Sequence, residues 1–164
     1  MRLFSSYGHP VPRVAGRNQK GGRTAAARIL RTAFSDERDV IEMDITAAYD
    51  VPGLRSLVRT FEFVRGPNAA LVITDAWASD APLDFETAIT TRSAWRCDGP
   101  LALTLDAGER RSVAVTIEAP ENRIEISSET IEEDCVPFTR IALRTVRPFP
   151  QGIVVVRCSP KLTE

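Results

Sequence analysis

Residues 55–77 read RSLVRTFEFVRGPNAALVITDAW, and this stretch decides the fold that we predict. In its first half Leu57, Arg59 and Phe61 fall at alternate positions, and a β-strand places alternate side chains on one face. The tripeptide at 66–68, Gly-Pro-Asn, supplies turn chemistry. The second half is rich in β-branched residues, which are typical of strands. The stretch therefore predicts a β-hairpin.

The same pattern of short strands and turn signals continues on both sides of this hairpin. The segment at 25–34 is Ala-rich and could form a helix, but the alternating neighbour at 40–45 favours a strand. The other strands that we expect lie at residues 85–91, 101–105, 112–117, 123–128, 139–146 and 152–158, the last two joined through 148–151. About eleven strands with turn signals between them are typical of a sandwich. We predict an all-β fold, an antiparallel two-sheet β super-sandwich that buries one face of each sheet.

Composition places the chain among ordinary globular proteins. Its 164 residues suit a single domain spanning 1–164, with 43% hydrophobic and 26% charged residues. The formal net charge of −1 gives no global attraction to nucleic acid or to a membrane, so we expect neither partner. The basic residues between 13 and 31 form either a solvated face or a patch that meets an anionic polymer.

The compartment of the protein is left open by its sequence. No run approaches the roughly 20 apolar residues of a membrane helix, and the first residues lack the apolar stretch of a signal peptide. We expect a cytoplasmic protein if the chain is complete, and a periplasmic or secreted one if it is a fragment. Cys97, Cys135 and Cys158 lack the spacing of a disulfide framework or a zinc motif. We expect buried free thiols, with one disulfide as the alternative in an exported protein.

The chain has one histidine, His9, in the segment SSYGHPVPRVAGRNQ at residues 5–19. A lone histidine is usually structural. Here Pro10 and Pro12 limit the backbone to extended forms, which predicts a stiff segment with His9 at its start. A neutral imidazole in that place could ligate a metal or take part in proton transfer.

The residues around His9 carry a family resemblance. The segment is similar to one in heparinase II/III-type polysaccharide lyases, matching at His9, Val14, Gly16 and Gln19, and in a variant also at Gly8, Val11 and Pro12. Downstream, residues 40–49, 57–63 and 72–75 resemble three further segments of the family in the same order. The resemblance is clearest over about residues 5–80. The family has Asn and Asp where this chain has Pro10 and Ala15, so any role of those two side chains is lost or different here.

The resemblance implies both a fold and a function. Relatives combine a helical toroid with a C-terminal antiparallel β super-sandwich, and they cleave uronate-containing polysaccharides by β-elimination. Their catalytic Asn, His and Tyr come largely from the toroid. This chain resembles the C-terminal β-sandwich domain alone, so we expect a module that contributes to a cleft for an acidic polysaccharide, a glycosaminoglycan or alginate, and that is inactive without a helical domain or subunit.

The resemblance also implies zinc in the full-length context. The family site takes one His from an H-x-H segment, an Asp shortly after it, and the His that matches His9. The sequence holds no second histidine, and a zinc site needs three or four protein ligands. We therefore expect His9 to be one ligand of a partial site, with no zinc bound tightly by this chain alone.

Three further residues near His9 are candidates for the site. Tyr7 lies two positions before His9, on the same face if the segment is extended, and is a weak catalytic candidate beside the alternative of a packing residue. Arg13 and Arg17 could bind a sugar carboxylate through bidentate contacts, or serve solubility.

Other conspicuous residues have structural interpretations. Arg59 alternates with apolar neighbours and so points to the buried face, where Glu42, Asp44 or Asp75 would be its partner. Trp77 and Trp95 could stack on sugar rings, although core packing is favoured. The acidic residues after the strand at 123–128 are expected in a solvated loop; they are Glu129, Glu132, Glu133 and Asp134.

Two rival functions stay open beside the lyase module. The first is a non-catalytic carbohydrate-binding or scaffold sandwich. The second is a complete small lyase that uses Tyr7 and His9. An encoded helical domain near the gene would favour the lyase module over both.

Overall fold

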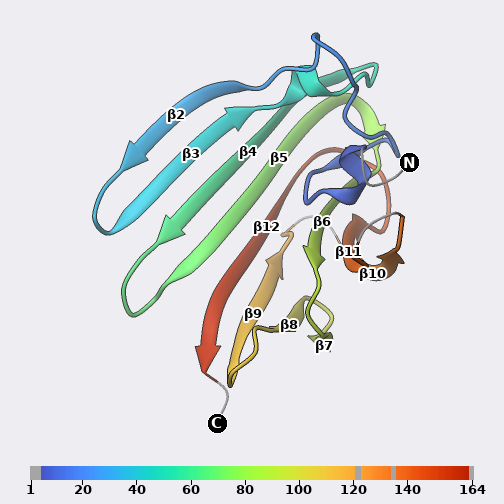
Figure 1. The fold of residues 1–164 in the computed structure, drawn as a ribbon. Coiled ribbons are helices and arrows are strands. Elements are labelled where there is room, and N and C mark those ends of the chain that lie inside the picture. The colour runs from blue at the N-terminus through green and yellow to red at the C-terminus, as the bar shows by residue number, and fades with distance from the viewer. Residues whose placement is uncertain (1–4, 121–122, 134–135, 163–164) are drawn as a thin grey trace.

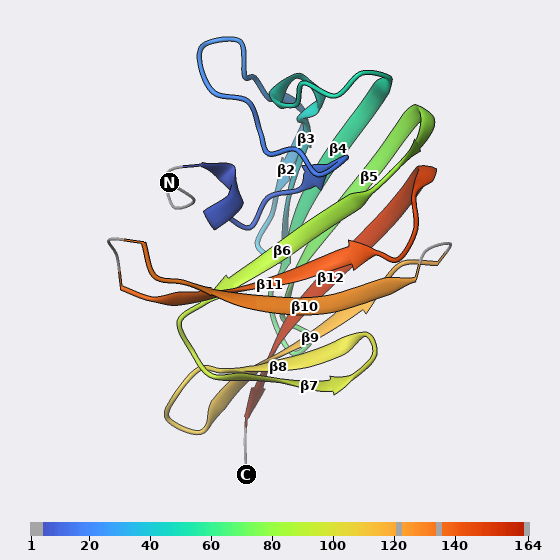
Figure 2. The same cartoon turned by 90° about the vertical axis from the view of Figure 1, so that its right-hand side faces the viewer.

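The protein is an all-β sandwich, as the alternating sequence pattern predicts. The computed structural model describes residues 5–120, 123–133 and 136–162, which form twelve strands and two short 3-10 helices. Two antiparallel sheets lie against each other, one of four strands and one of eight. Figures 1 and 2 show the larger sheet as a long, twisted layer, with the smaller sheet across part of one face.

The smaller sheet has the order β1-β6-β11-β10. Its strands are β1 (Arg13–Val14), β6 (Phe85–Thr91), β11 (Phe138–Thr145) and β10 (Ile124–Ile131). The larger sheet has the order β2-β3-β4-β5-β12-β9-β8-β7. Its strands are β2 (Arg28–Phe34), β3 (Arg38–Asp44), β4 (Leu54–Val64), β5 (Ala70–Leu83), β12 (Phe149–Leu162), β9 (Arg111–Glu118), β8 (Ala102–Asp106) and β7 (Trp95–Gly99). The 3-10 helices are η1 (Ser6–Gly8) and η2 (Thr46–Ala48).

The hairpin that decides the fold is confirmed as β4 and β5. Their register pairs Leu57 with Trp77 and Phe61 with Ile73. Gly66, in the connection, has a φ of 84°, a left-handed conformation that glycine adopts without steric cost. The segment predicted as a strand at 25–34 is a strand from Arg28 to Phe34, where β2 pairs with β3, and the three alanines at 25–27 lie before it.

The last two predicted strands do not lie beside each other. β11 pairs with β6 and β10 in the smaller sheet, whereas β12 pairs with β5 and β9 in the larger one. The Pro-containing connection thus carries the chain from one sheet to the other. β7 was not expected, because its five residues lie beside the turn signal Asp98-Gly99-Pro100.

The core lies between the sheets and is formed by inward-facing residues of both. Leu57 and Val154 come from the larger sheet, Phe85 and Ile141 from the smaller one, and all four are fully buried. Trp77 stacks on Phe85 with ring centroids 4.1 Å apart and an interplanar angle of 4°. Trp77 is therefore a core residue, the interpretation that its pattern favours, and its ring is unavailable to a sugar.

An ion pair is buried in the same layer as this apolar core. Arg59 on β4 donates from Nε and Nη2 to the two carboxylate oxygens of Asp75 on β5, both at 2.7 Å. Their side chains are 4% and 1% exposed. Arg59 also donates to Thr87 Oγ1 at 2.9 Å and to the Pro10 carbonyl at 2.7 Å. The buried orientation of Arg59 is confirmed, and of its three suggested partners Asp75 is the right one.

Two other expectations are corrected in part. Cys97 is an exposed free thiol, not a buried one, because it lies on edge strand β7. Cys158 is a partly buried free thiol whose pKa is raised by burial, and Cys135 lies outside the described residues. Glu129 is not in a loop but in β10, while Asp134 also lies outside the described residues. None of the helices in the described part of the chain is long and apolar enough to cross a membrane.

We predict that Arg59→Leu lowers the free energy of unfolding by about 3–5 kcal/mol, because Asp75 is left as an unpaired buried charge. The double variant Arg59→Leu/Asp75→Leu should lose less than the two single variants together, since neither charge remains. Urea unfolding followed by circular dichroism measures both. Arg55→Ala is the control in the same strand, because its pair with Asp80 is exposed and such pairs contribute less than about 1 kcal/mol. Equal losses in Arg55→Ala and Arg59→Leu would contradict the prediction.

Candidate functional site

The segment that carries the candidate residues begins as a 3-10 turn. Residues Ser6–Gly8 form η1, whose start is capped by a hydrogen bond from the Tyr7 backbone N–H to Ser5 Oγ at 3.3 Å. The chain becomes extended at His9, with φ −114° and ψ 155°. The extended conformation at His9 agrees with the prediction of an extended segment that starts there. Because Tyr7 lies in the 3-10 turn, Tyr7 and His9 do not share one face of a strand.

Two arginines from the sheets and one tyrosine that follows η2 hold the carbonyl groups of this segment. Arg140 Nε donates to the Tyr7 carbonyl at 2.8 Å, and Arg59 Nη1 to the Pro10 carbonyl at 2.7 Å. The Tyr49 hydroxyl donates to the Pro12 carbonyl at 2.7 Å. Beyond them β1 pairs with β6. These bonds hold the backbone at residues 7, 10 and 12. The two prolines limit the backbone conformation, and the hydrogen bonds in addition fix the segment against the sheets.

The segment passes from one face of the smaller sheet to the other. Phe85 and Thr87 of β6 face the core or Arg59, so Glu86 between them faces outward. Arg140 lies opposite Glu129 in the register of β11 and β10, and both side chains contact Tyr7. Tyr7 therefore packs on the outer face of the smaller sheet. By Val14, which is fully buried in the core, the chain has reached the inner side.

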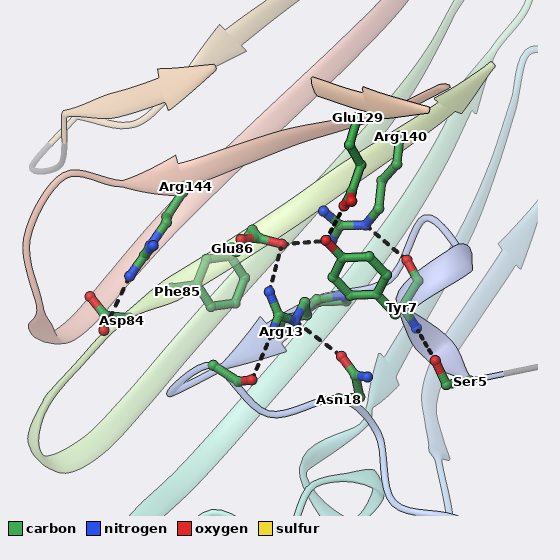
Figure 3. Close-up of polar contacts among 12 residues, drawn as sticks. Ser5, Tyr7, Arg13, Asn18, Asp84, Phe85, Glu86, Glu129, Arg140 and Arg144 are labelled. Carbon is green, nitrogen blue, oxygen red and sulfur yellow. Dashed lines mark hydrogen bonds and ion pairs between the residues drawn. The ribbon is translucent and has the colours of Figure 1, made fainter. Parts of the chain in front are cut away.

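Five polar residues gather at Tyr7, and we call them the Tyr7 cluster: Tyr7, Arg13, Glu86, Glu129 and Arg140 (Figure 3). The guanidinium carbons of Arg140 and Arg13 lie 4.4 Å and 4.9 Å from the centre of the Tyr7 ring. The Tyr7 hydroxyl donates to Glu129 Oε1. Glu86 Oε1 lies 2.6 Å from Arg140 Nη2 and 3.6 Å from Arg13 Nη1. Two cations and two carboxylates thus surround one phenol.

The surroundings of Tyr7 keep its phenol protonated. Partial burial raises the pKa of Tyr7 most, and the hydrogen bond to the Glu129 carboxylate raises it further, against opposing contributions from Arg140 and Arg13. A phenol with a raised pKa donates a hydrogen bond or a proton and is a poor base at neutral pH. The cluster therefore offers a donor that is already directed at Glu129.

The two candidate substrate-binding arginines have different surroundings. Arg13 Nε donates to Asn18 Oδ1 at 3.0 Å and its Nη2 to the Gly16 carbonyl at 2.7 Å. Most of its fork is thereby committed inside the protein. Arg17 is exposed and donates from Nη1 to the Asp50 carbonyl at 2.7 Å. Of the two, Arg17 presents more of its guanidinium to solvent.

His9 lies at the surface beside the Tyr7 cluster. Within residues 5–120, 123–133 and 136–162, no group of three or more His, Cys, Asp or Glu side chains could hold a metal ion. The described residues therefore do not fit a complete zinc site. The side chain of His9 is exposed.

Next to Gly8 lies a shallow depression that the sequence did not indicate. Thr90, Thr91, Arg92 and Phe138 line it together with Gly8, and its volume is about 230 Å³. Arg92 is exposed, and its side chain has no hydrogen bond or ion pair within the described residues. This depression brings an uncommitted guanidinium and two hydroxyl residues to the edge of the Tyr7 cluster.

Arg140 and Glu86 were also missed, although one signal could have found Arg140. It stands in the apolar run RIAL at 140–143 as Arg59 stands in its own strand, and an arginine in such a run needs a buried partner. Glu86 has no comparable signal, because its role depends on which strands become neighbours.

Comparison with known proteins gives a consistent result at the level of fold. No protein-family model matches the sequence, and no curated protein matches it. Solved structures match closely in shape. A heparinase III gene product has a TM-score of 0.74 at 9% sequence identity, with 94% of this chain and 24% of that chain covered. Another heparinase III has a TM-score of 0.71 at 14% identity, with 95% and 24% covered.

A heparan sulfate lyase mutant from Pedobacter heparinus is similar, with a TM-score of 0.69 at 12% identity and 96% of this chain and 25% of that chain covered. The fold that the family resemblance implied is therefore confirmed: nearly all of this chain has the shape of one part of these proteins. The chain spans about a quarter of the length of the solved structures that it matches.

We predict that both tyrosines resist ionisation in the folded protein. Burial raises the pKa of Tyr49 above its ordinary value of about 10 more strongly than that of Tyr7. Because the folded state holds these protons more tightly, their contribution to stability is present below pH ~10 and is lost as the pH rises beyond it. Phenolate absorbance should rise later in the native chain than in urea, and Tyr49→Phe should remove the larger delay. Coincident curves in a folded chain would contradict this.

We predict that Arg140→Ala loosens the start of the segment. The variant removes the hydrogen bond to the Tyr7 carbonyl and one of the two arginines on Glu86. The backbone N–H groups of Gly8 and His9, which bond Ser5 and Ser6 carbonyls, should then exchange their hydrogens faster. Hydrogen exchange read by mass spectrometry tests this. The control is Arg144→Ala. Arg144 lies on β11 like Arg140, but it forms only an exposed ion pair with Asp84, so its loss should leave these exchange rates unchanged.

Proposed function

We propose that this chain is the β-sandwich module of a polysaccharide lyase that cleaves a uronate-containing acidic polysaccharide by β-elimination. The observation that carries the proposal is the match of 94–96% of the chain to heparinase III and heparan sulfate lyase structures. A match in fold does not itself transfer an activity. The surface around the Tyr7 cluster supplies the supporting chemistry.

The module contributes one wall of the cleft through the surface around Gly8. The exposed groups there are His9 and Arg92, and Arg17 is an exposed arginine further along the same N-terminal segment. Guanidinium groups pair with the carboxylate of a uronate in a planar, bidentate arrangement. Neutralising that carboxylate favours removal of the proton beside it, so these arginines would serve both binding and the elimination step.

The module is inactive alone in this proposal. The polar groups of the Tyr7 cluster bond one another, and its phenol stays protonated. The base that removes the sugar proton then comes from a helical domain or subunit. Zinc belongs to that larger assembly, where His9 would be one donor beside ligands that this chain's described residues do not supply.

The second candidate is a non-catalytic carbohydrate-binding or scaffold sandwich. The observation that favours it is the same commitment of Arg13, Glu86 and Arg140 to internal contacts, which suits a structural support as well as an enzyme. The two candidates differ in one measurable property, because only the lyase module restores cleavage when a helical domain is added.

We expect the 164-residue chain alone to release no unsaturated uronate ends from heparan sulfate, other glycosaminoglycans or alginate. Together with a helical domain encoded beside it, it should give ultraviolet-absorbing unsaturated ends. His9→Ala should lower the activity of that mixture and its response to added zinc. The control is Arg123→Ala, which removes an exposed arginine directly before β10, at the end of that strand away from Glu129.

Each outcome of this assay separates the candidates. Activity of the chain alone that vanishes in Tyr7→Phe or His9→Ala would make it a complete small lyase. Binding of acidic polysaccharide with no cleavage in the mixture would favour the binding module. Neither binding nor cleavage would count against the proposal as a whole.

A further inference from the structure

A second hollow lies at the far end of the larger sheet, away from the Tyr7 cluster. It is formed where β7, β8 and β9 end the sheet, in the lower part of Figures 1 and 2. Its volume is about 390 Å³, within the ordinary range of ligand pockets. The residues that line it are Ala94, Trp95, Arg96, Thr104, Asp106, Arg111 and Ser112.

The hollow contains one guanidinium that is paired and one that is not. Arg96 Nε lies 2.9 Å from Asp98 Oδ1. Arg111 begins β9 and is exposed, and its side chain has no hydrogen bond or ion pair within the described residues. Since Arg96 is neutralised by its partner, Arg111 is the group with a free fork of donors for a carboxylate or a sulfate.

Hydrogen-bond acceptors stand beside this guanidinium. Thr104 and Ser112 are 4% and 5% exposed, although both line the hollow. The Thr104 hydroxyl donates to Asp98 Oδ2 at 2.5 Å, which leaves its oxygen free to accept. Asp106 accepts one hydrogen bond at Oδ1 from the Gly108 backbone. Its second carboxylate oxygen can accept from a hydroxyl group.

An aromatic side chain completes the wall. Trp95 is half-buried and packs against the core on one side, yet it also lines the hollow. Indole rings combine a large apolar area with an N–H donor. An apolar wall with hydroxyl acceptors and a guanidinium matches a sugar ring, which has both apolar C–H faces and polar edges.

We propose that this hollow is a second saccharide subsite, which holds one acidic sugar unit of a polysaccharide. Arg111 pairs with the carboxylate or sulfate, Asp106 and the two hydroxyl groups accept from ring hydroxyls, and Trp95 contacts the ring. A simple anion such as phosphate fits less well, because Asp106 and Asp98 repel it without a hydroxyl to bind. The choice of an acidic saccharide as the ligand rests on the proposed function. The existence of the hollow and its lining residues is independent of that function.

The two tryptophans make the experiment direct. Trp77 is 3% exposed and stacked in the core, so Trp95 is the one whose emission should respond to a ligand. Heparan sulfate and alginate oligosaccharides are titrated into the 164-residue chain, with dextran oligosaccharides as the uncharged comparison. We expect saturable fluorescence changes with the acidic probes alone, and no change in Trp95→Phe.

Arg111→Ala should weaken binding by about tenfold or more, as expected for losing a charge-assisted bidentate contact. The control Arg123→Ala removes another exposed arginine, which directly precedes β10 in the smaller sheet, and should leave the affinity unchanged. Isothermal titration with Trp95→Phe, which reports binding without fluorescence, separates loss of signal from loss of affinity.

Three results would overturn the subsite. The first is no Trp95 response to any acidic probe, and the second is equal affinity in Arg111→Ala and the unaltered chain. The third is an equal loss of affinity in Arg111→Ala and Arg123→Ala, which would indicate unspecific charge attraction. The lyase assay with a helical domain is independent of this hollow. Cleavage in the lyase assay, together with no change in Trp95 fluorescence, would reject the subsite alone. No cleavage, together with an Arg111-dependent fluorescence change, would reject the lyase function alone.

Discussion

The buried guanidinium of Arg59 is the constraint on which the rest of the structure depends. Its donors reach Asp75 on the neighbouring strand, Thr87 on the opposite sheet and the carbonyl of Pro10. A buried charge is tolerated only when its hydrogen bonds are satisfied. The hairpin register, the docking of the two sheets and the path of the N-terminal segment must therefore all be correct at once. One side chain links elements whose pairing the local sequence does not specify.

Arg140 repeats this arrangement on the outer face of the smaller sheet. It is 2% exposed, and it bonds Glu86 and the Tyr7 carbonyl. The N-terminal segment is thus held from outside by Arg140 and from inside by Arg59 and Tyr49. Because both holds bind backbone carbonyls, they fix the course of the chain without dictating its exposed side chains. The surface at His9 and Arg92 can vary in sequence while its position stays the same.

The sequence predicted what depends on neighbouring residues. Alternation and turn chemistry identified nearly every strand. An arginine within an apolar run correctly indicated a buried ion pair, although Asp75 was only one of three candidate partners. Contacts between distant segments could not be predicted from the sequence, because a period-two pattern indicates a strand but not its neighbours in the sheet. That is why β11 and β12 were not assigned to different sheets, and why Glu129 was placed in a loop. The 3-10 turn at Tyr7 removes the condition under which Tyr7 and His9 would share one face, since the two prolines restrict only the residues from His9 onward.

The same contacts separate structural from functional arginines. The guanidinium groups of Arg59 and Arg140, and most of that of Arg13, donate their hydrogen bonds inside the protein. They could bind a sugar only by losing these internal bonds. Arg92 and Arg111 line hollows and have no partner within the described residues. A guanidinium that keeps a free fork beside hydroxyl residues has lost little solvation and gains most from an incoming carboxylate. Under the proposed function, an acidic polysaccharide would be selected by the arginines that folding leaves unpaired.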